Sequence, residues 1–184
     1  MRFPADFWWG ASTAAYQVEG NNRGSALWDW ERRKGWERSG AAVNSWKLWR
    51  DDIDCLKRLN LNAYRFSVEW SRVQPSPDRV DEDALARYAG WARRLKEEGI
   101  RPFVCLHHFS EPAWLLQLHP EGWLDDGVPA RFLRFAERVA GALKETVSDW
   151  VTFNEPMVFI VGAYGMGQFP PGRRLLLRPK VLAE

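Results

Sequence analysis

The sequence predicts an α/β fold in which parallel strands alternate with helices. Short runs rich in β-branched and aromatic residues recur along the chain, amphipathic helical patterns separate them, and polar residues gather where the runs end. Strands that alternate with helices of this length form parallel βαβ units. A chain of 184 residues can bury one real core, so we treat residues 1–184 as a single domain.

The N-terminal part of the chain predicts a strand followed by a long loop. The run FWWGASTAA, from Phe7 to Ala15, is apolar and rich in small residues, which is typical of a buried strand. Residues 21–44 carry scattered glycines among polar and tryptophan residues, so we expect a loop there. A loop of that length in a compact domain is usually functional or disordered.

Two amphipathic stretches with recognisable ends predict the first two long helices. The first begins near Ser45, a suitable N-cap, and Asn60 can close it in a left-handed conformation. The second begins at Asp81 or Asp83 and ends at Gly99. In both, apolar residues recur every three or four positions, so each helix should bury one face.

A third helix and three further strands complete the pattern. Pro129 is expected in the N-terminal turn of the helix. The strands are predicted at Ala63–Trp70, Arg101–Phe109 and Asp149–Phe153. Long loops and polar residues follow their carboxyl ends, where α/β folds place their sites. No glycine-rich phosphate signature is present, so half of a (β/α)8 barrel fits better than a dinucleotide-binding sheet.

Composition narrows the classes of partner and compartment. The formal net charge is +2, which does not suggest nucleic acid or an anionic membrane as a partner. Cys55 and Cys105 lie inside apolar elements and predict buried free thiols in a reducing compartment. No apolar run resembles a signal peptide or a membrane span, so a cytoplasmic protein is expected. Twelve tryptophans suit both a core and flat platforms for sugar rings.

Neither a metal nor another cofactor is expected. No Cys/His set has zinc-ligand spacing. Adjacent strand residues point to opposite faces, so His107 and His108 should not share one site. An amide and a carboxylate stand together at Asn154 and Glu155, and Pro156 is expected to keep Glu155 extended at the tip of its strand.

Four segments resemble the motifs of one enzyme family in order and spacing. They are FWWGASTAAYQVEG at Phe7–Gly20, YRFSVEWSR at Tyr64–Arg72, LHHF before Pro112, and TFNEP at Thr152–Pro156. The family is glycoside hydrolase family 1, the retaining β-glucosidases and β-galactosidases. The resemblance spans nearly the whole chain and implies the N-terminal half of a TIM (β/α)8 barrel, with about four βα units.

The resemblance also implies roles for six residues. Glu155 matches the general acid/base, Asn154 the ligand of the sugar 2-hydroxyl, Gln17 and His108 the glycone-binding amide and imidazole, Arg65 the arginine beside the nucleophile, and Trp123 part of a substrate-cleft segment. The substrate would be a β-linked glycoside or oligosaccharide. Asn44-Ser45-Trp46 and Phe109 depart from the family pattern, which leaves the particular sugar and aglycone open.

The second catalytic carboxylate is not found in this sequence. In the family the nucleophile lies in a Thr-Glu-Asn-Gly segment on the seventh strand, and no such segment occurs here. Glu69 and Glu111 could border the cleft as substitutes. Four strands would also leave two open sheet edges, which predicts a homo-oligomer or a complementary C-terminal half-barrel as partner. Hydrolysis by this chain alone should therefore be weak or absent.

Three interpretations remain open at this point. The chain is the N-terminal half of a split or oligomeric β-glycosidase, a non-catalytic sugar-binding or structural remnant, or a fragment of a longer enzyme. Activity on a chromogenic β-glucoside, with and without a C-terminal half, separates the first from the second. The intact mass and the reading frame beyond Glu184 test the third.

Overall fold

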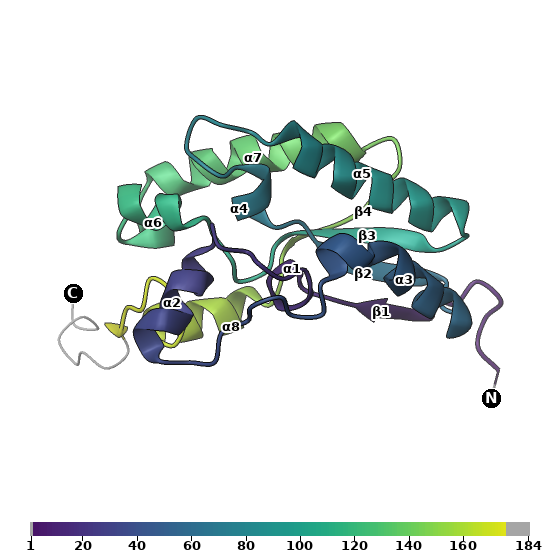
Figure 1. Ribbon diagram of the computed structural model, residues 1–184, viewed down its shortest axis with the longest axis horizontal. Coiled ribbons are helices and arrows are strands. Elements are labelled where there is room, and N and C mark those ends of the chain that lie inside the picture. The colour runs from purple at the N-terminus through teal and green to yellow at the C-terminus, as the bar shows by residue number, and fades with distance from the viewer. Residues whose placement is uncertain (1, 176–184) are drawn as a thin grey trace.

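The computed structural model describes residues 2–175, which form a parallel sheet packed against helices (Figure 1). The strands pair in chain order as β1-β2-β3-β4, with bounds Gly10–Ser12, Ala63–Ser67, Arg101–His107 and Asp149–Phe153. The long crossover helices are α3 (Ser45–Arg58), α5 (Glu82–Glu97) and α7 (Gly127–Leu143). The predicted α/β fold with four parallel βα units is confirmed.

The main hydrophobic core lies between one face of the sheet and the three long helices. Val104 of β3, Tyr88 of α5 and Val139 of α7 are fully buried there, and Ile53 of α3 joins them. Each large apolar side chain buried in this way contributes about 1.5–3 kcal/mol. Each of the three predicted amphipathic helices contributes buried apolar residues to this core, whereas Leu59 and Leu133, which the predicted apolar stripes included, are exposed.

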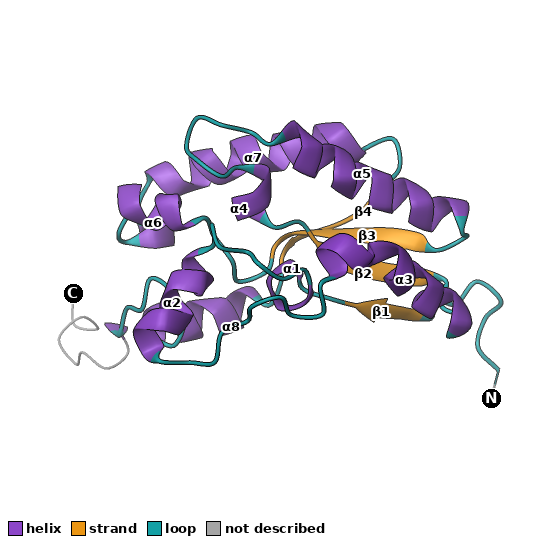
Figure 2. Cartoon of the chain, viewed as in Figure 1, coloured by secondary structure: helices purple, strands orange, loops and turns teal. Residues whose placement is uncertain are grey.

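The short helices follow the carboxyl ends of the strands. They are α1 (Ala15–Val18), α2 (Ala26–Lys34), α4 (Trp70–Val73), α6 (Ala113–Leu118) and α8 (Pro156–Ile160), with a 3-10 turn at Gly122–Leu124 and a π turn at Val161–Gly165. Figure 2 shows α1, α2, α6 and α8 gathered at one end of the sheet. The predicted site residues therefore come from segments that share one end of the fold.

Two predictions for the N-terminal segment are wrong. The strand expected at Phe7–Ala15 is confined to Gly10–Ser12, and it is exposed because it is an edge strand with β2 as its neighbour. The loop expected over residues 21–44 contains α2. Ser25 caps α2 by accepting a hydrogen bond from the Leu27 amide at 3.1 Å, and Gly35 ends it with φ of 65°. Both are ordinary helix-boundary signals.

The ends of the long helices agree with the sequence in most places. The Asp81 carboxylate caps α5 by accepting from the Ala84 amide at 2.9 Å, and Gly99 follows with φ of 74°. Asn60 is left-handed after α3, as predicted, with φ of 53°. The N-cap of α3 is Asn44 rather than Ser45, and α7 begins at Gly127, two residues before Pro129.

The two cysteines differ in their surroundings. Cys105 is buried in β3, whereas Cys55 is exposed on α3, so the prediction of two buried thiols holds for Cys105 and is wrong for Cys55. Cys55 lies beside the apolar stripe of its helix rather than within it. Across residues 2–175, no helix is both long and apolar enough to span a bilayer.

Among the described residues each outer strand of the sheet has one strand neighbour. Aromatic residues before β1 are exposed and form their own cluster: Phe3, Phe7 and Trp9, with Trp8 beside them on Phe103. Beyond β4, apolar residues of α8 and the following turn are exposed: Met157, Val158, Ile160, Val161 and Met166. Apolar surface of this extent on a folded protein usually marks a contact region.

Candidate functional site

Arg65 and Asn154 form the centre of the candidate site. Arg65 lies in β2 and Asn154 directly follows β4, yet the arginine Nη2 donates to the asparagine Oδ1 at 2.7 Å. The same Nη2 lies 3.4 Å from the Sγ of Cys105 in β3. Because the Asn154 oxygen is occupied by Arg65, the amide nitrogen is left as a donor. A donor of this kind can bind a sugar hydroxyl.

His108 lies beside this pair, just beyond the end of β3. Burial is the largest cause lowering its pKa to about 4, and the charges of Arg65 and His107 act in the same direction. The imidazole is therefore neutral at physiological pH, with one nitrogen as donor and the other as acceptor. Its buried Nδ1 has no partner among the described residues. A neutral imidazole suits a ligand with hydroxyl groups.

We expect His108 to titrate with a midpoint near 4, measured by NMR of its ring protons. The ordinary value is 6.5, so its contribution to stability is present above pH 6.5 and is lost as the pH falls toward 4. Arg65→Met should raise the midpoint toward the ordinary value because it removes a neighbouring positive charge. Arg134→Met, a change of the same kind on α7, should leave it unchanged. A midpoint near 6.5 in the unmodified chain would contradict the expectation.

His107 has a different environment from His108. It is 1% exposed, and its Nε2 lies 3.1 Å from the Oε1 of Glu111. Its ring packs edge-on against Trp123 and Phe159. The two histidines therefore have different neighbours. Within residues 2–175 no group of three or more His, Cys, Asp and Glu side chains is arranged to hold a metal ion.

Trp123 is half-buried, and its ring packs against the ring of His107. Its indole nitrogen donates to the Glu111 Oε1 at 2.9 Å, and its backbone amide donates to the Tyr164 hydroxyl at 2.6 Å. The ring also packs against Phe153 at 5.1 Å between centroids. With its nitrogen already used by Glu111, Trp123 can offer a ligand only its ring face or edge.

Gln17 and Glu155 project into solvent. Gln17 lies on the short helix α1 and Glu155 directly precedes α8, and both residues are exposed. The prediction of an extended Glu155 is wrong, since its φ of 40° and ψ of 61° are left-handed. A following proline disfavours the right-handed helical region, and the left-handed turn lets the chain pass directly from β4 into α8. Neither the Gln17 nor the Glu155 side chain forms a hydrogen bond with another described residue.

Glu69 and Glu111 do not border a cleft, contrary to expectation. Each is 1% exposed. Glu69 caps α4 by accepting from Ser71, and Glu111 binds Trp123 and His107. Both follow strands closely, so their position in the sequence resembles that of a catalytic acid. Their burial removes them as candidates for a second reactive carboxylate.

Two contacts at the site were missed from the sequence. Cys105 touches Arg65, and the alternation of side chains along β3 could have placed it on the same face of the sheet. The Tyr164 hydroxyl accepts a hydrogen bond from the backbone of Trp123, and a π turn positions Tyr164. The apolar, glycine-rich composition of this segment does not indicate such a turn. A π turn is a helical turn with hydrogen bonds between residues five apart, which makes it wider than an α-helical turn, and it has no reliable sequence signature.

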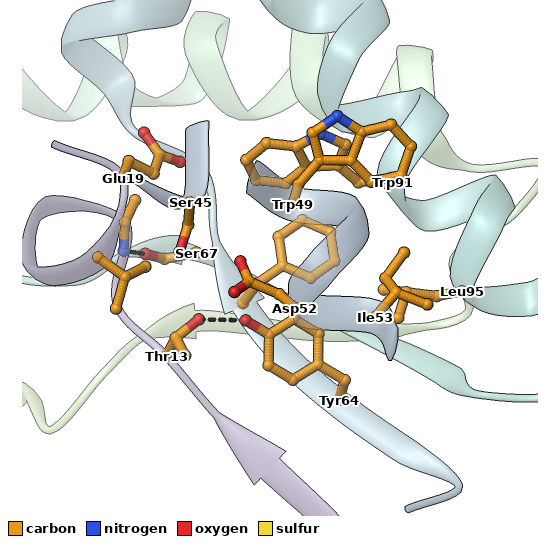
Figure 3. Close-up of a pocket in the computed structure, with 13 residues that line it drawn as sticks. Thr13, Glu19, Ser45, Trp49, Asp52, Ile53, Tyr64, Ser67, Trp91 and Leu95 are labelled. Atoms are coloured by element: carbon orange, nitrogen blue, oxygen red, sulfur yellow. Dashed lines mark hydrogen bonds between the residues drawn. The ribbon is translucent and has the colours of Figure 1, made fainter. Parts of the chain in front are cut away.

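The pocket drawn in Figure 3 is not lined by any of the six candidate site residues. It lies between β2 and the helices α3 and α5, near Thr13, Tyr64 and Trp91, with Glu19 at one side. Its volume is about 20 Å³. A space of this size holds about one water molecule and excludes a sugar ring. The Thr13 and Tyr64 hydroxyls close one wall by a hydrogen bond of 2.6 Å.

Comparison with known proteins agrees with the motifs. The model of glycosyl hydrolase family 1 matches residues 1–181. The human cytosolic β-glucosidase is 36% identical over 184 residues, covering 94% of this chain and 39% of its own. Among solved structures, the β-glycosidase from Pyrococcus horikoshii matches with 40% identity and a TM-score of 0.86, covering 94% of this chain and 40% of that one. The family 1 β-glucosidase from Thermotoga maritima, in complex with isofagomine lactam, matches with 31% identity and a TM-score of 0.86 over 94% and 41% of the two chains. This chain thus spans about two fifths of the length of the proteins it matches.

Proposed function

This chain belongs to glycosyl hydrolase family 1, and we propose that it supplies the acid/base half of a retaining β-glycosidase site. The observation that carries the proposal is the Arg65–Asn154 hydrogen bond of 2.7 Å with the neutral His108 beside it and Glu155 next in sequence. Arg65, His108 and Asn154 lie on or directly after three neighbouring strands, β2, β3 and β4, and this arrangement supports the proposal. The named relatives are β-glucosidases and β-glycosidases, which supports a β-linked glycoside as the substrate.

In the proposed reaction Glu155 donates a proton to the glycosidic oxygen as the bond to the leaving group breaks. The amide nitrogen of Asn154 binds the adjacent hydroxyl of the sugar, because Arg65 already holds the amide oxygen. His108 and Gln17 bind further hydroxyls of the same ring. Trp123 contributes an apolar surface at the edge of the sugar. General acid catalysis of this kind contributes about 10²–10⁴-fold to the rate.

A retaining enzyme also needs a nucleophilic carboxylate about 5–5.5 Å from its acid. Glu19, Glu69 and Glu111 follow the strand ends but are buried. We propose that the nucleophile comes from the part of the barrel outside residues 1–184, on the same polypeptide or on a partner. The exposed apolar residues before β1 and on α8 adjoin, along the chain, the two outer strands of the sheet, and each outer strand has an edge where a further strand could pair.

The test is complementation. The 184-residue chain is mixed with a second polypeptide that carries the part of the Pyrococcus horikoshii β-glycosidase that this chain does not match, and hydrolysis of 4-nitrophenyl β-glucoside is followed. We expect little turnover by the chain alone and a gain of about 10²-fold or more in the mixture, the scale of one catalytic group. The C-terminal polypeptide alone is the control.

Two results would contradict the proposal in different ways. Efficient turnover by a monodisperse monomer, measured beside light scattering, would mean that this chain carries its own nucleophile. A mixture that forms a stable complex and binds a β-glucoside without cleaving it would favour the second candidate, a non-catalytic sugar-binding half-barrel. Association of the chain with itself in light scattering would identify a second copy as the partner.

A further inference from the structure

Two buried glutamates, Glu19 and Glu69, belong to a single connected network of hydrogen bonds. Glu19 follows α1, and Glu69 follows β2. Both are 1% exposed, so neither can react with a ligand. Burying a carboxylate is costly unless hydrogen bonds or an opposite charge compensate it. Their partners therefore show what the two side chains hold in place.

Glu19 ties the segment after β1 to α4 and α5. Its Oε2 accepts from the Nε of Arg72 at 2.6 Å, and its Oε1 accepts from the Tyr88 hydroxyl at 2.6 Å. Arg72 also donates to the carbonyl of Gly20 and stacks on Trp46 at 4.1 Å from the ring centroid. The segment that carries Gln17 is thereby fixed at its end to two other helices.

Glu69 ties the segment after β3 to the same place. Its Oε1 accepts from the hydroxyls of Ser71 at 2.7 Å and Ser110 at 2.9 Å. The Ser110 hydroxyl also lies 2.8 Å from that of Ser25. Tyr88 joins the contacts of Glu19 to those of Glu69. Its hydroxyl accepts from the backbone amide of Glu69 at 3.1 Å and donates to the Glu19 carboxylate.

The connected groups are Glu19, Glu69, Arg72, Tyr88 and Ser110, which we call the buried carboxylate network. Its two ends are each two residues from a proposed sugar contact, since Gln17 precedes Glu19 and His108 precedes Ser110. The structure gives neither Gln17 nor His108 a side-chain hydrogen bond to another described residue. Their separation therefore depends on how the two backbone segments are held.

We propose that the buried carboxylate network sets the spacing between Gln17 and His108 and thereby determines the affinity of the site for the sugar ring. Its members are positioning residues that do not touch the ligand. The proposal rests on the proposed function for the identity of the ligand, and on the geometry alone for the positioning. Because none of the hydrogen bonds of the network involves Glu155, it should affect binding and KM more than the rate of bond cleavage.

The experiment uses the full chain labelled with ¹⁵N, and the variants Tyr88→Phe and Ser110→Ala, each complemented with the C-terminal polypeptide described under the proposed function. Each variant removes one hydroxyl and keeps the surrounding packing, including the contact of the Tyr88 ring with Trp91 at 5.1 Å. The probe is the glucose-shaped iminosugar 1-deoxynojirimycin, titrated by NMR and calorimetry. Ile53→Val is the matched control because it weakens the same core without touching the network.

We expect both variants to shift the signals of the Gln17 side-chain amide and the His108 ring, and to weaken binding of the probe about tenfold, the scale of one lost hydrogen bond. Because the groups act as one connected unit, the double variant should lose little more than either single variant. Ile53→Val should change neither the signals nor the affinity.

Signals and affinity in the variants equal to those of Ile53→Val would overturn the positioning proposal. Failure of the complemented unmodified protein to bind the probe would instead contradict the proposed function. In that case the Gln17 and His108 signals still test the network, because they need no ligand.

Discussion

Glu155→Gln is expected to lower hydrolysis of 4-nitrophenyl β-glucoside by the complemented protein about 10²–10⁴-fold, the usual contribution of a general acid. Glutamine has the shape of glutamate but cannot donate a proton to the leaving oxygen. The Arg65–Asn154 pair does not involve the Glu155 side chain, so sugar binding should be retained. The measurement is kcat and KM for the complemented variant beside the complemented unmodified chain.

The leaving group distinguishes loss of the acid from general damage. A 2,4-dinitrophenyl group departs as a stable anion without help from an acid, so the variant should lose far less activity on that glucoside. Glu145→Gln is the matched control, since Glu145 is an exposed glutamate before the other end of β4. Equal losses on the two substrates would argue against Glu155 as the acid.

Arg72→Ala should be the most destabilising single change near the site. The variant leaves the Glu19 carboxylate without its charged partner and the Gly20 carbonyl without its donor. Loss of buried hydrogen bonds of this kind costs about 2 kcal/mol at pH 6. Urea unfolding followed by tryptophan fluorescence measures the change, since the midpoint should fall while the slope stays constant.

The cost of Arg72→Ala should depend on pH in a defined window. Burial raises the pKa of Glu19 from 4.5 to about 7, against the opposing effect of Arg72. Because the pKa is higher in the folded state, Glu19 contributes to the free energy of unfolding below pH 4.5, and this contribution is lost as the pH rises to about 7. Without Arg72 the folded pKa rises further, so the variant keeps losing stability above pH 7, by about 1.4 kcal/mol per pH unit. The cost should therefore be constant below pH 6 and increase above pH 7.

Two controls test the cause of that pH dependence. Adding Glu19→Gln to Arg72→Ala removes the titrating group, and the increase above pH 7 should disappear. Lys57→Ala breaks the exposed ion pair with Glu98 and should have a small effect without such an increase. A cost of Arg72→Ala that is independent of pH from 6 to 8.5 would mean that Arg72 does not change the ionisation of Glu19 in the folded protein over that range.

Local signals were sufficient where the structure depends on neighbouring residues. Asp81 caps α5 and Asn60 and Gly99 adopt left-handed conformations, as their residue types predict. The boundary signals of α2 at Ser25 and Gly35 were also present. The glycines at positions 24, 35 and 40 suggest a loop over the whole stretch, but none of them lies inside α2, and Gly35 ends the helix.

Residue type was insufficient where burial decides the role. Glu69, Glu111 and Glu155 all follow strands of the sheet, and the sequence does not distinguish them by charge or spacing. The structure buries the first two and leaves Glu155 exposed. The difference arises because Ser110 and Trp123 come from other segments to bind the buried pair.

The sequence by itself determined the order of the strands and the three long helices, the family motifs and the identity of the candidate acid. These depend on periodicity and on short motifs, which are local properties of the chain. Only the tertiary structure decided that Arg65 binds Asn154, 89 residues away, and that Tyr88 joins Glu19 to Glu69. Such contacts form when parallel strands align in register, so their geometry is a property of the packed sheet.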